Sequence, residues 1–315
     1  MRVGAVDLGT NTTRLLVAEV TDGRLDELHR ETRITRLGEG VDSRRRLLPV
    51  PIARVRNVLT DYRRTTETLR VARTLAAATS AFRDADNGEA FLGEIEWSYG
   101  FATRLLSGGE EAELTRRGVG TAHPLTAGTL VIDIGGGSTE VIVDEYHDSL
   151  ELGSVRNTER FLHTDPPEPH ELHGCARAVR SLLEERVPDS VRPRVRDAVG
   201  VAGTITTLAA LDLGLARYDR ERVHGHRLSR EGAHAQLERL AALPLPERRE
   251  LPALEPARAP VIVAGAVILT ETLDFFGLRA IEASERDILD GIALAAAELP
   301  TPEESAGPPW AHACC

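Results

Sequence analysis

The sequence contains no lysine, so all 38 of its basic residues are arginine. This absence excludes two common kinds of site. A Walker phosphate-binding loop needs the lysine of its Gly-Lys-Ser/Thr end, and Schiff-base catalysis needs a lysine amine. Any phosphate that the chain binds must therefore be held by arginine forks and by backbone amides.

Cysteine is also scarce. The chain has three: Cys175 stands alone, and Cys314 and Cys315 end the sequence. These spacings match neither a zinc site nor a disulfide framework. The N-terminal segment reaches Asp7 after only a few residues, and no apolar run is long enough to span a bilayer. We therefore expect no signal peptide, no membrane partner and a cytoplasmic location.

The charge is unbalanced toward acid, with a formal net charge of −11 at pH 7. Non-specific nucleic-acid binding needs a basic surface, so we expect no nucleic-acid partner. A polyanionic substrate would need a groove in which arginines gather. At 315 residues, with 42% hydrophobic residues, the chain is a globular protein long enough for two domains.

A glycine-rich stretch, Leu130–Val143, organises the rest of the chain. An apolar run enters Asp133, crosses Gly135, Gly136, Gly137 and Ser138, and leaves as a second apolar run. The residues after the glycines are β-branched, which favours a returning strand over the helix that a dinucleotide fold requires. Successive amides in such a turn form a concave anion site, so we expect the turn to bind phosphate.

The N-terminal segment repeats this pattern. At an offset of 126 positions (133 − 7), Asp7 falls on Asp133, Gly9 on Gly135 and Thr12 on Ser138. The repeat predicts two β-hairpins, each tipped by a phosphate-sized turn and each opening its own α/β domain. Two such turns can face each other across a cleft and hold a ligand from both sides.

The other expected elements follow from periodicity and from capping signals. Helices are expected over 51–69, 89–99, from 109, over 170–187, from 203, and over 260–276 and 286–298. Strands are expected over 71–78, 103–106 and 198–201, and a strand followed by a turn over 32–40 and again over 149–156. Loops are expected over 166–169 and 244–260, and a frayed tail from Thr301.

Several polar residues have two readings at this stage. The acidic residues Glu110, Glu111 and Glu113 suit the first turn of a helix. Asp7 and Asp133 could merely hold their turns, and Glu140 could be an exposed cross-strand residue. Gly203 and Thr204 begin a helix whose amides could bind a phosphate, or Thr204 could simply cap it. The pair His224 and His226 is more typical of structural contacts than of a metal site.

With these motifs in hand, the sequence resembles the exopolyphosphatase and guanosine pentaphosphate phosphatase family of the actin-like ATPase superfamily. The resemblance rests on Asp7–Thr12, Ala78–Arg83, Ser107–Ala112, Asp133–Glu140 and Ala202–Thr204, in family order. It implies an α/β fold of two ribonuclease-H-like domains facing each other across a cleft. The expected limits are 1–124 for the first domain, with the helix at about 286–299 packing on it, 125–285 for the second, and a disordered tail over 300–315.

The resemblance also implies an activity and assigns residues to it. The expected reaction is Mg²⁺-assisted release of the terminal phosphate of polyphosphate or of guanosine pentaphosphate. The family's general base falls on Glu111 and its second essential carboxylate on Asp133, with Asp133 and Glu140 placed near the metal. The expected phosphate-binding residues are Asn11, Thr12, Arg83, Gly135, Gly136, Gly137, Ser138, Gly203 and Thr204.

Other readings stay open. Polyphosphate and guanosine pentaphosphate present the same terminal phosphate, so the motifs do not separate them. A nucleotide-binding sensor with little turnover is a reading from another class, which the presence of Glu111 and Asp133 together argues against. A sugar kinase is weaker, because no acceptor site is visible. Longer relatives carry a further C-terminal helical domain, so we expect a weaker grip on very long polyphosphate, and a homodimer is a further expectation.

Overall fold

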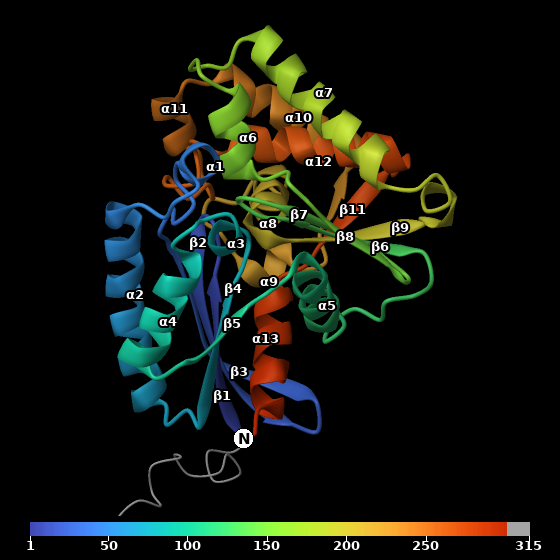
Figure 1. The fold of residues 1–315 in the computed structure, drawn as a ribbon. Helices are drawn as coiled ribbons and strands as arrows, with labels where there is room; N and C mark the ends of the chain where they lie inside the picture. The colour runs from blue at the N-terminus through green and yellow to red at the C-terminus, as the bar shows by residue number, and fades with distance from the viewer. Residues whose placement is uncertain (301–315) are drawn as a thin grey trace, which may run out of the picture.

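Two β-sheets form the frame of the protein. The structure, a computed structural model, describes residues 1–300; the expected tail over 300–315 therefore lies outside the described residues apart from its first position. One sheet is built from the N-terminal third of the chain and the other from its central and C-terminal parts, and they stand apart with helices between and around them (Figure 1).

The first sheet has the order β3-β2-β1-β4-β5. It contains β1 (Arg2–Leu8), β2 (Thr12–Thr21), β3 (Arg24–Ile34), β4 (Arg73–Ala78) and β5 (Ala102–Leu105). The strands β1, β2 and β3 are antiparallel neighbours, whereas β4 and β5 run parallel to β1. The first glycine turn therefore joins the first two strands, β1 and β2, of an antiparallel meander.

The second sheet repeats this plan, with the order β10-β11-β9-β6-β7-β8. It contains β6 (Thr129–Ile134), β7 (Thr139–Val143), β8 (Tyr146–Leu150), β9 (Asp197–Val201), β10 (Arg227–Ser229) and β11 (Ala280–Ala283). The strands β6, β7 and β8 form the antiparallel meander, and β9 and β11 run parallel to β6. The predicted duplication is thus confirmed strand by strand, with β10 as an added edge strand, and so is the two-unit α/β fold class.

The outer faces of the two sheets carry most of the helices. On the first sheet these are α2 (Pro49–Thr68) and α4 (Gly88–Tyr99), while α1 (Val41–Arg44) and α3 (Ser80–Arg83) are single turns. Val55, Leu59 and Tyr62 of α2 recur at helical spacing and are buried against this sheet. We call the first sheet with α1–α4 and α13 (Ile288–Glu298) lobe I.

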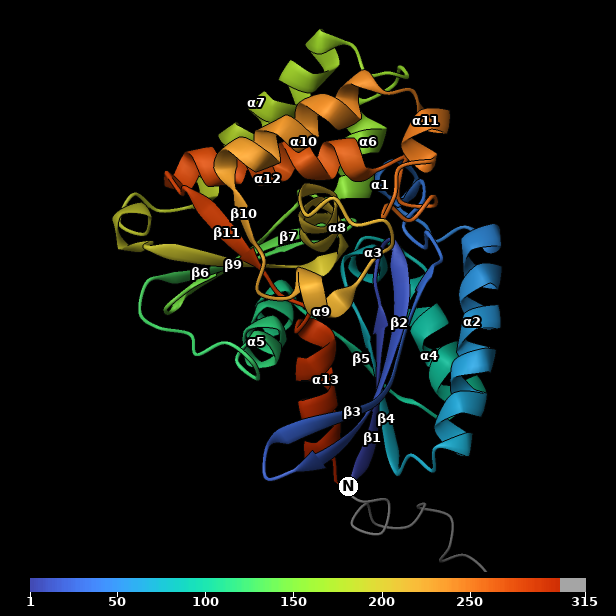
Figure 2. The same ribbon diagram turned by 180° about the vertical axis from the view of Figure 1, so that it is seen from behind.

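The second sheet carries a larger set of helices, most of which lie in the upper half of Figure 2. It comprises α6 (Ser154–Phe161), α7 (Pro169–Arg186), α8 (Ala202–Asp212), α9 (Arg220–Val223), α10 (Arg230–Ala242), α11 (Leu245–Arg249) and α12 (Ile262–Phe276), with a 3₁₀ turn over Arg192–Arg194. Helix α12 is apolar almost all round because it is buried between its neighbours. We call the second sheet with α6–α12 lobe II.

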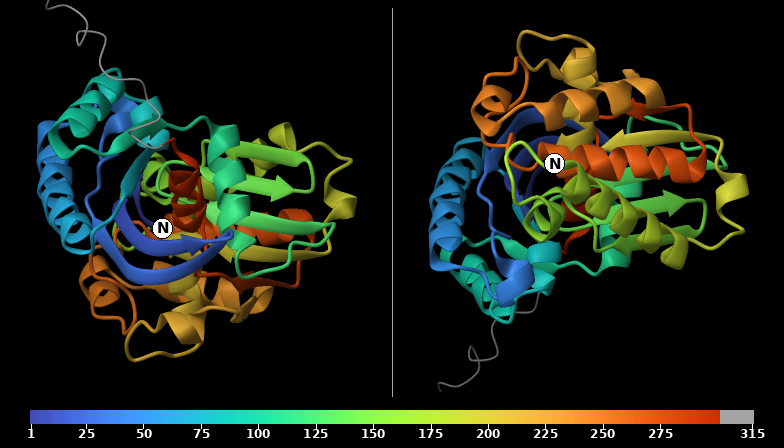
Figure 3. Two further views of the ribbon diagram at one scale, coloured as in Figure 1. Left: turned by 90° about the horizontal axis from the view of Figure 1, so that it is seen from below. Right: turned by 90° about the horizontal axis from the view of Figure 1, so that it is seen from above.

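Two helices, α5 (Gly108–Val119) and α13, lie side by side in the space between the sheets (Figures 1 and 3). Ala112 and Val119 of α5 pack on the inner face of the second sheet, while α13 packs on the inner face of the first. Since side chains alternate along a strand, Asp133 points to the same inner face as Val131. The same alternation turns Asp7 inward with Ala5.

The expected course of three segments was wrong in part. A strand and turn were predicted over 149–156, but β8 ends at Leu150 and helix α6 begins at Ser154. The helix forms there because the amides of Ser154 and Val155 bind carbonyls of the second glycine turn, a contact far away in sequence. The strand expected from Thr32 begins already at Arg24, and the loop expected over 244–260 includes α11. Among residues 1–300, no helix combines the length and apolarity that crossing a bilayer demands.

Candidate active site

A cleft of about 980 Å³ lies between the two lobes and receives both glycine turns. Its lining contains every residue that was expected to be catalytic, phosphate-binding or metal-binding except Arg83. The predicted residues that line it are Asn11, Thr12, Glu111, Asp133, Gly135, Gly136, Gly137, Ser138, Glu140, Gly203 and Thr204.

In the first turn, Gly9–Thr12, the central carbonyls accept hydrogen bonds from the protein, whereas the central amides have no acceptor among the described residues. The carbonyl of Thr10 accepts from the amide of Gly38, and that of Asn11 accepts from the two residues after Ile34. Within residues 1–300, the amides of Thr10 and Asn11 have no hydrogen-bond acceptor, and neither does the buried Asn11 Oδ1 have a donor. Since buried polar groups are normally paired, these groups indicate a place for a ligand or water.

The second turn, Gly135–Ser138, is built in the same way. The carbonyl of Gly135 accepts from Ser154 at 3.0 Å, and that of Gly136 accepts from Val155 at 2.9 Å and from the amide that follows it. The amides of Gly136, Gly137 and Ser138 find no acceptor among the described residues. Three such successive amides are suited to an anion, and the binding of phosphate there stays a prediction.

The two turns touch each other at the floor of the cleft. A methyl group on Gly136 would lie 3.1 Å from the amide nitrogen of Asn11, and one on Gly137 would lie 2.7 Å from Thr10 Oγ1 and 2.5 Å from Ser80 Oγ. A methyl group on Gly137 would therefore require the Thr10 and Ser80 side chains to move, and one on Gly136 would be in unusually tight contact with the first turn. The repeated motifs thus form one composite site from both lobes.

Glu111 enters this site from the first turn of α5. Ser107 and Glu110 form a capping box that starts the helix, and Glu113 pairs with Arg116, so the three acidic residues have separate roles. Glu111 is only 7% exposed and accepts a hydrogen bond from Arg83 Nη1 at 2.6 Å. Burial raises the pKa of Glu111 to about 7 against the opposing effect of the arginine.

Arg83 lies behind Glu111 and outside the cleft lining. Its Nη1 also donates to the carbonyl of Leu106 at 2.9 Å, which fixes the guanidinium beside the carboxylate. The predicted contact of Arg83 with phosphate stays a prediction. What the geometry shows is a charged partner for Glu111.

Asp133 and Glu140 face each other across the second hairpin. They are paired residues of β6 and β7, and both side chains are buried. Glu140 Oε1 accepts from Ser149 Oγ at 2.7 Å. Burial, together with the charges of nearby carboxylates, raises the pKa of Asp133 to about 8 and that of Glu140 well above its ordinary value. The reading of Glu140 as an exposed residue was wrong.

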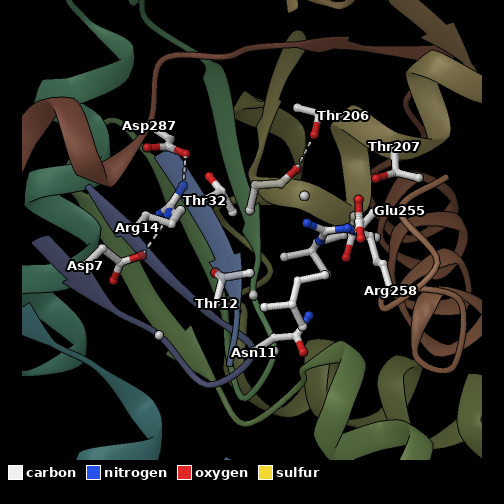
Figure 4. A pocket seen from close by; sticks show the side chains of 18 of the residues that line it. Asp7, Asn11, Thr12, Arg14, Thr32, Thr206, Thr207, Glu255, Arg258 and Asp287 are labelled. Atoms are coloured by element: carbon white, nitrogen blue, oxygen red, sulfur yellow. Dashed lines mark hydrogen bonds and ion pairs between the residues drawn. The ribbon is translucent and has the colours of Figure 1, made fainter. Parts of the chain in front are cut away.

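The corresponding pair in lobe I is an ion pair that the sequence reasoning missed. Asp7 lies opposite Arg14 in the first hairpin, and Arg14 Nε donates to Asp7 Oδ2 at 2.8 Å. Arg14 also binds Asp287, the N-cap of α13 (Figure 4). The offset of 126 places Arg14 on Glu140 (14 + 126 = 140), which is the signal that could have found it.

A further cation lies over the N-terminus of α8. Thr204 is a buried residue inside α8, and Val201 occupies the N-cap without a side-chain bond, so the capping reading of Thr204 was wrong. The guanidinium of Arg258 rests directly on Gly203 and has no ion-pair partner within residues 1–300 (Figure 4). No motif marks Arg258, which comes from the proline-rich loop before α12.

The histidine pair lies away from this cleft. His226 Nε2 and Asp212 Oδ2 are 2.7 Å apart, and the ring of His224 packs edge-on against that of His123. Over residues 1–300, no three or more His, Cys, Asp or Glu side chains are grouped so as to hold a metal ion by themselves.

Comparison with known proteins agrees with this architecture. Residues 16–298 match the Ppx/GppA phosphatase family. The chain is 40% identical to exopolyphosphatase 2 of Mycobacterium tuberculosis over 314 residues, which cover 94% of this chain and 98% of that protein. An exopolyphosphatase structure from Cytophaga hutchinsonii has a TM-score of 0.87 at 25% identity, covering 96% of this chain and 99% of that one. A Ppx/GppA structure from Aquifex aeolicus has a TM-score of 0.80 at 30% identity, with coverages of 95% and 98%.

Proposed function

Because the chain belongs to the Ppx/GppA phosphatase family, and is thus a hydrolase of phosphoanhydride bonds, we propose that it releases the terminal phosphate of inorganic polyphosphate. One observation carries the proposal. Five backbone amides of the two turns, at Thr10, Asn11, Gly136, Gly137 and Ser138, lack an acceptor among the described residues, and they lie in the same cleft as Glu111. Such an arrangement suits a phosphoryl group that is held by amides while a base acts on water beside it.

Glu111 serves as the general base. Hydrolysis forms a bond from a water oxygen to the terminal phosphorus and breaks the bond to the bridging oxygen, and the water must lose a proton. A carboxylate with a pKa of about 7 is matched to this task near neutral pH. The amides of the turns stabilise the charge on the transferred group without reorganisation.

Asp133 and Glu140 are the residues that would hold Mg²⁺. In lobe I the equivalent aspartate is neutralised by Arg14, whereas in lobe II two buried carboxylates face each other. A hard cation with oxygen ligands fits this excess of negative charge, and Mg²⁺ needs only one or two carboxylates when phosphates and water supply the rest. When bound, it would neutralise charge on the substrate phosphates.

Arg258 and the N-terminus of α8 would hold the following phosphates of the chain. Its guanidinium forms no ion pair within 4.0 Å among residues 1–300, and the positive end of the α8 dipole lies beneath it. An arginine fork over a helix N-terminus is suited to a phosphate. This second anion position would let the cleft bind a phosphate of the substrate in addition to the terminal phosphate.

Guanosine pentaphosphate is the alternative substrate. Its terminal phosphate would use the same turns, and one feature favours a nucleoside: Tyr218 lines the cleft and is 41% exposed, so its ring is available for stacking. A sensor with little turnover is disfavoured, because sensing alone needs no buried base beside the free amides.

The test is phosphate release with Mg²⁺ from short polyphosphate, long polyphosphate and guanosine pentaphosphate in parallel. Glu111→Gln should lower kcat at least 100-fold. The matched control is Glu113→Gln, two residues along the same helix in an exposed ion pair, which should stay within twofold. Faster release from the nucleotide would favour the alternative, and equal activity of the two variants would contradict Glu111 as the base.

A further inference from the structure

Arg156 joins the second glycine turn to lobe I through a single side chain. It lies in the first turn of α6 and is 6% exposed. Its Nε donates to the carbonyl of Gly137 at 2.7 Å, and its two terminal nitrogens bind Asp42 and Asp84 of lobe I. One guanidinium therefore contacts both halves of the composite site.

On the lobe II side, Arg156 binds a carbonyl of the glycine turn that no backbone amide of α6 binds. The carbonyls of Gly135 and Gly136 are held by backbone amides of α6, but that of Gly137 has the Arg156 side chain as its partner. The carbonyl and the amide that follows it belong to one planar peptide. Holding the Gly137 carbonyl thus sets the direction of the Ser138 amide, one of the three that have no acceptor in the described structure.

On the lobe I side, the contact leads to the general base. Asp84 is the C-cap of α3, and the last residue of α3 is Arg83, which binds Glu111. The side chain of Ser80, at the start of α3, lies 3.4 Å from Arg156 Nη2. This single helical turn therefore contacts Arg156 through Ser80 and its C-cap, and it contacts Glu111 through its last residue.

We propose that Arg156 is a positioning residue that keeps the Gly135–Ser138 turn in register with Glu111. It contacts neither the cleft nor a reacting atom, since it is not part of the cleft lining. Arginine is required because its planar fork reaches three acceptors at once, whereas lysine offers a single nitrogen. The kinetic part of the proposal rests on the proposed function.

The experiment compares Arg156→Met and Arg156→Lys with Arg160→Met. Arg160 lies one turn along α6 and binds the same Asp42, at 2.5 Å, but does not reach the glycine turn. We expect Arg156→Met to lower kcat for polyphosphate about 100-fold, as a shift of about 1 Å in the reacting groups would. KM should change less than threefold, Arg156→Lys should recover about tenfold of the loss, and Arg160→Met should stay within twofold.

A second readout needs no activity. Hydrogen exchange of the Ser154 and Val155 amides, which bind the turn carbonyls, should quicken at least tenfold in Arg156→Met and stay unchanged in Arg160→Met. If the wild-type chain releases no phosphate from any substrate, the proposed function fails while this readout still tests the positioning role. Equal kcat and equal exchange in the two methionine variants would overturn the proposal.

Should Arg156→Met not fold, Asp84→Asn decides the question, because it weakens only the lobe I end of the contact. A fall in kcat of tenfold or more with unchanged KM would support the positioning role. An unchanged kcat would overturn it.

Discussion

The pairing of Arg83 with Glu111 predicts how activity depends on pH. A base must be deprotonated to act, so kcat/KM should rise with pH and reach half of its plateau near the pKa of Glu111, about 7. Arg83 lowers that pKa through its charge and its 2.6 Å hydrogen bond. Arg83→Met should therefore move the acid limb of the profile to higher pH.

The size of the shift follows from the contact. A hydrogen bond between charged groups contributes about 1.5–3 kcal/mol, and 1.36 kcal/mol is one pKa unit, so the limb should move up by about one to two units. At pH 7 the deprotonated fraction of Glu111 would fall from about one half to roughly 1–10%, which lowers kcat/KM about 5- to 50-fold. Above pH 9 most of the activity should return.

The assay is phosphate release from short polyphosphate between pH 5.5 and 9.5 at fixed Mg²⁺. Arg104→Met is the matched control, because Arg104 pairs with Glu110, the exposed neighbour of Glu111 on the same helix. If the substrate itself titrates in this range, it does so equally with the control variant. The pH profile of Arg104→Met should therefore follow that of the wild type. A loss in Arg83→Met that is equal at every pH would refute the reasoning and return Arg83 to the predicted role of binding phosphate.

Three further predictions concern the turns, the carboxylates and the second anion position. Gly137→Ala should lower kcat/KM at least tenfold because the two turns would be pushed apart, whereas Gly93→Ala, in an open position of α4, should raise stability by about 1 kcal/mol and leave activity unchanged. With raised pKa values, Asp133 and Glu111 keep protons in the folded state that they lose on unfolding, so the melting temperature without Mg²⁺ should fall as pH rises from about 4.5 to 8. Added Mg²⁺ should raise the melting temperature more at pH 8 than at pH 5, and an equal rise at both would contradict the metal assignment. Arg258→Met should raise KM for polyphosphate about tenfold or more with kcat within threefold, as steady-state kinetics would show.

Those parts of the site that are local in sequence could be predicted from it. The two glycine turns, their strands and the start of α5 each lie within one continuous stretch of the chain, and the repeat made the match between the turns visible. Glu111 was more difficult, because acidic residues at a helix start have an ordinary explanation. Its proposed role came from the family resemblance, and the structure adds the reason why it differs from Glu110: one carboxylate caps the helix while the next lines the cleft.

The residues that were missed make contacts between segments that lie far apart in the chain. Arg156, Arg258 and Asp287 lie in segments with no recognisable motif, and their partners are distant in the chain: Arg156 meets Asp42 at a separation of 114 positions. Neither helical periodicity nor capping rules extend over such distances, because both arise from neighbouring turns of one helix. The same reason explains why α6 was read as a strand and turn, since its first amides are held by a turn that precedes it by many residues.

The comparison of the two hairpins gives the clearest argument about which lobe does the chemistry. Both keep an aspartate at the end of the first strand, but the residue opposite is Arg14 in lobe I and Glu140 in lobe II. An Asp–Arg pair satisfies its own charge and holds α13 in place through Asp287. Two buried carboxylates do the opposite, because burial and the charges of nearby carboxylates raise the pKa values of Asp133 and Glu140 unless a cation compensates. We therefore propose that the copy of the motif in lobe I is structural and that the copy in lobe II holds the metal, which predicts that Asp133→Asn abolishes the Mg²⁺ dependence of the melting temperature while Asp7→Asn retains it.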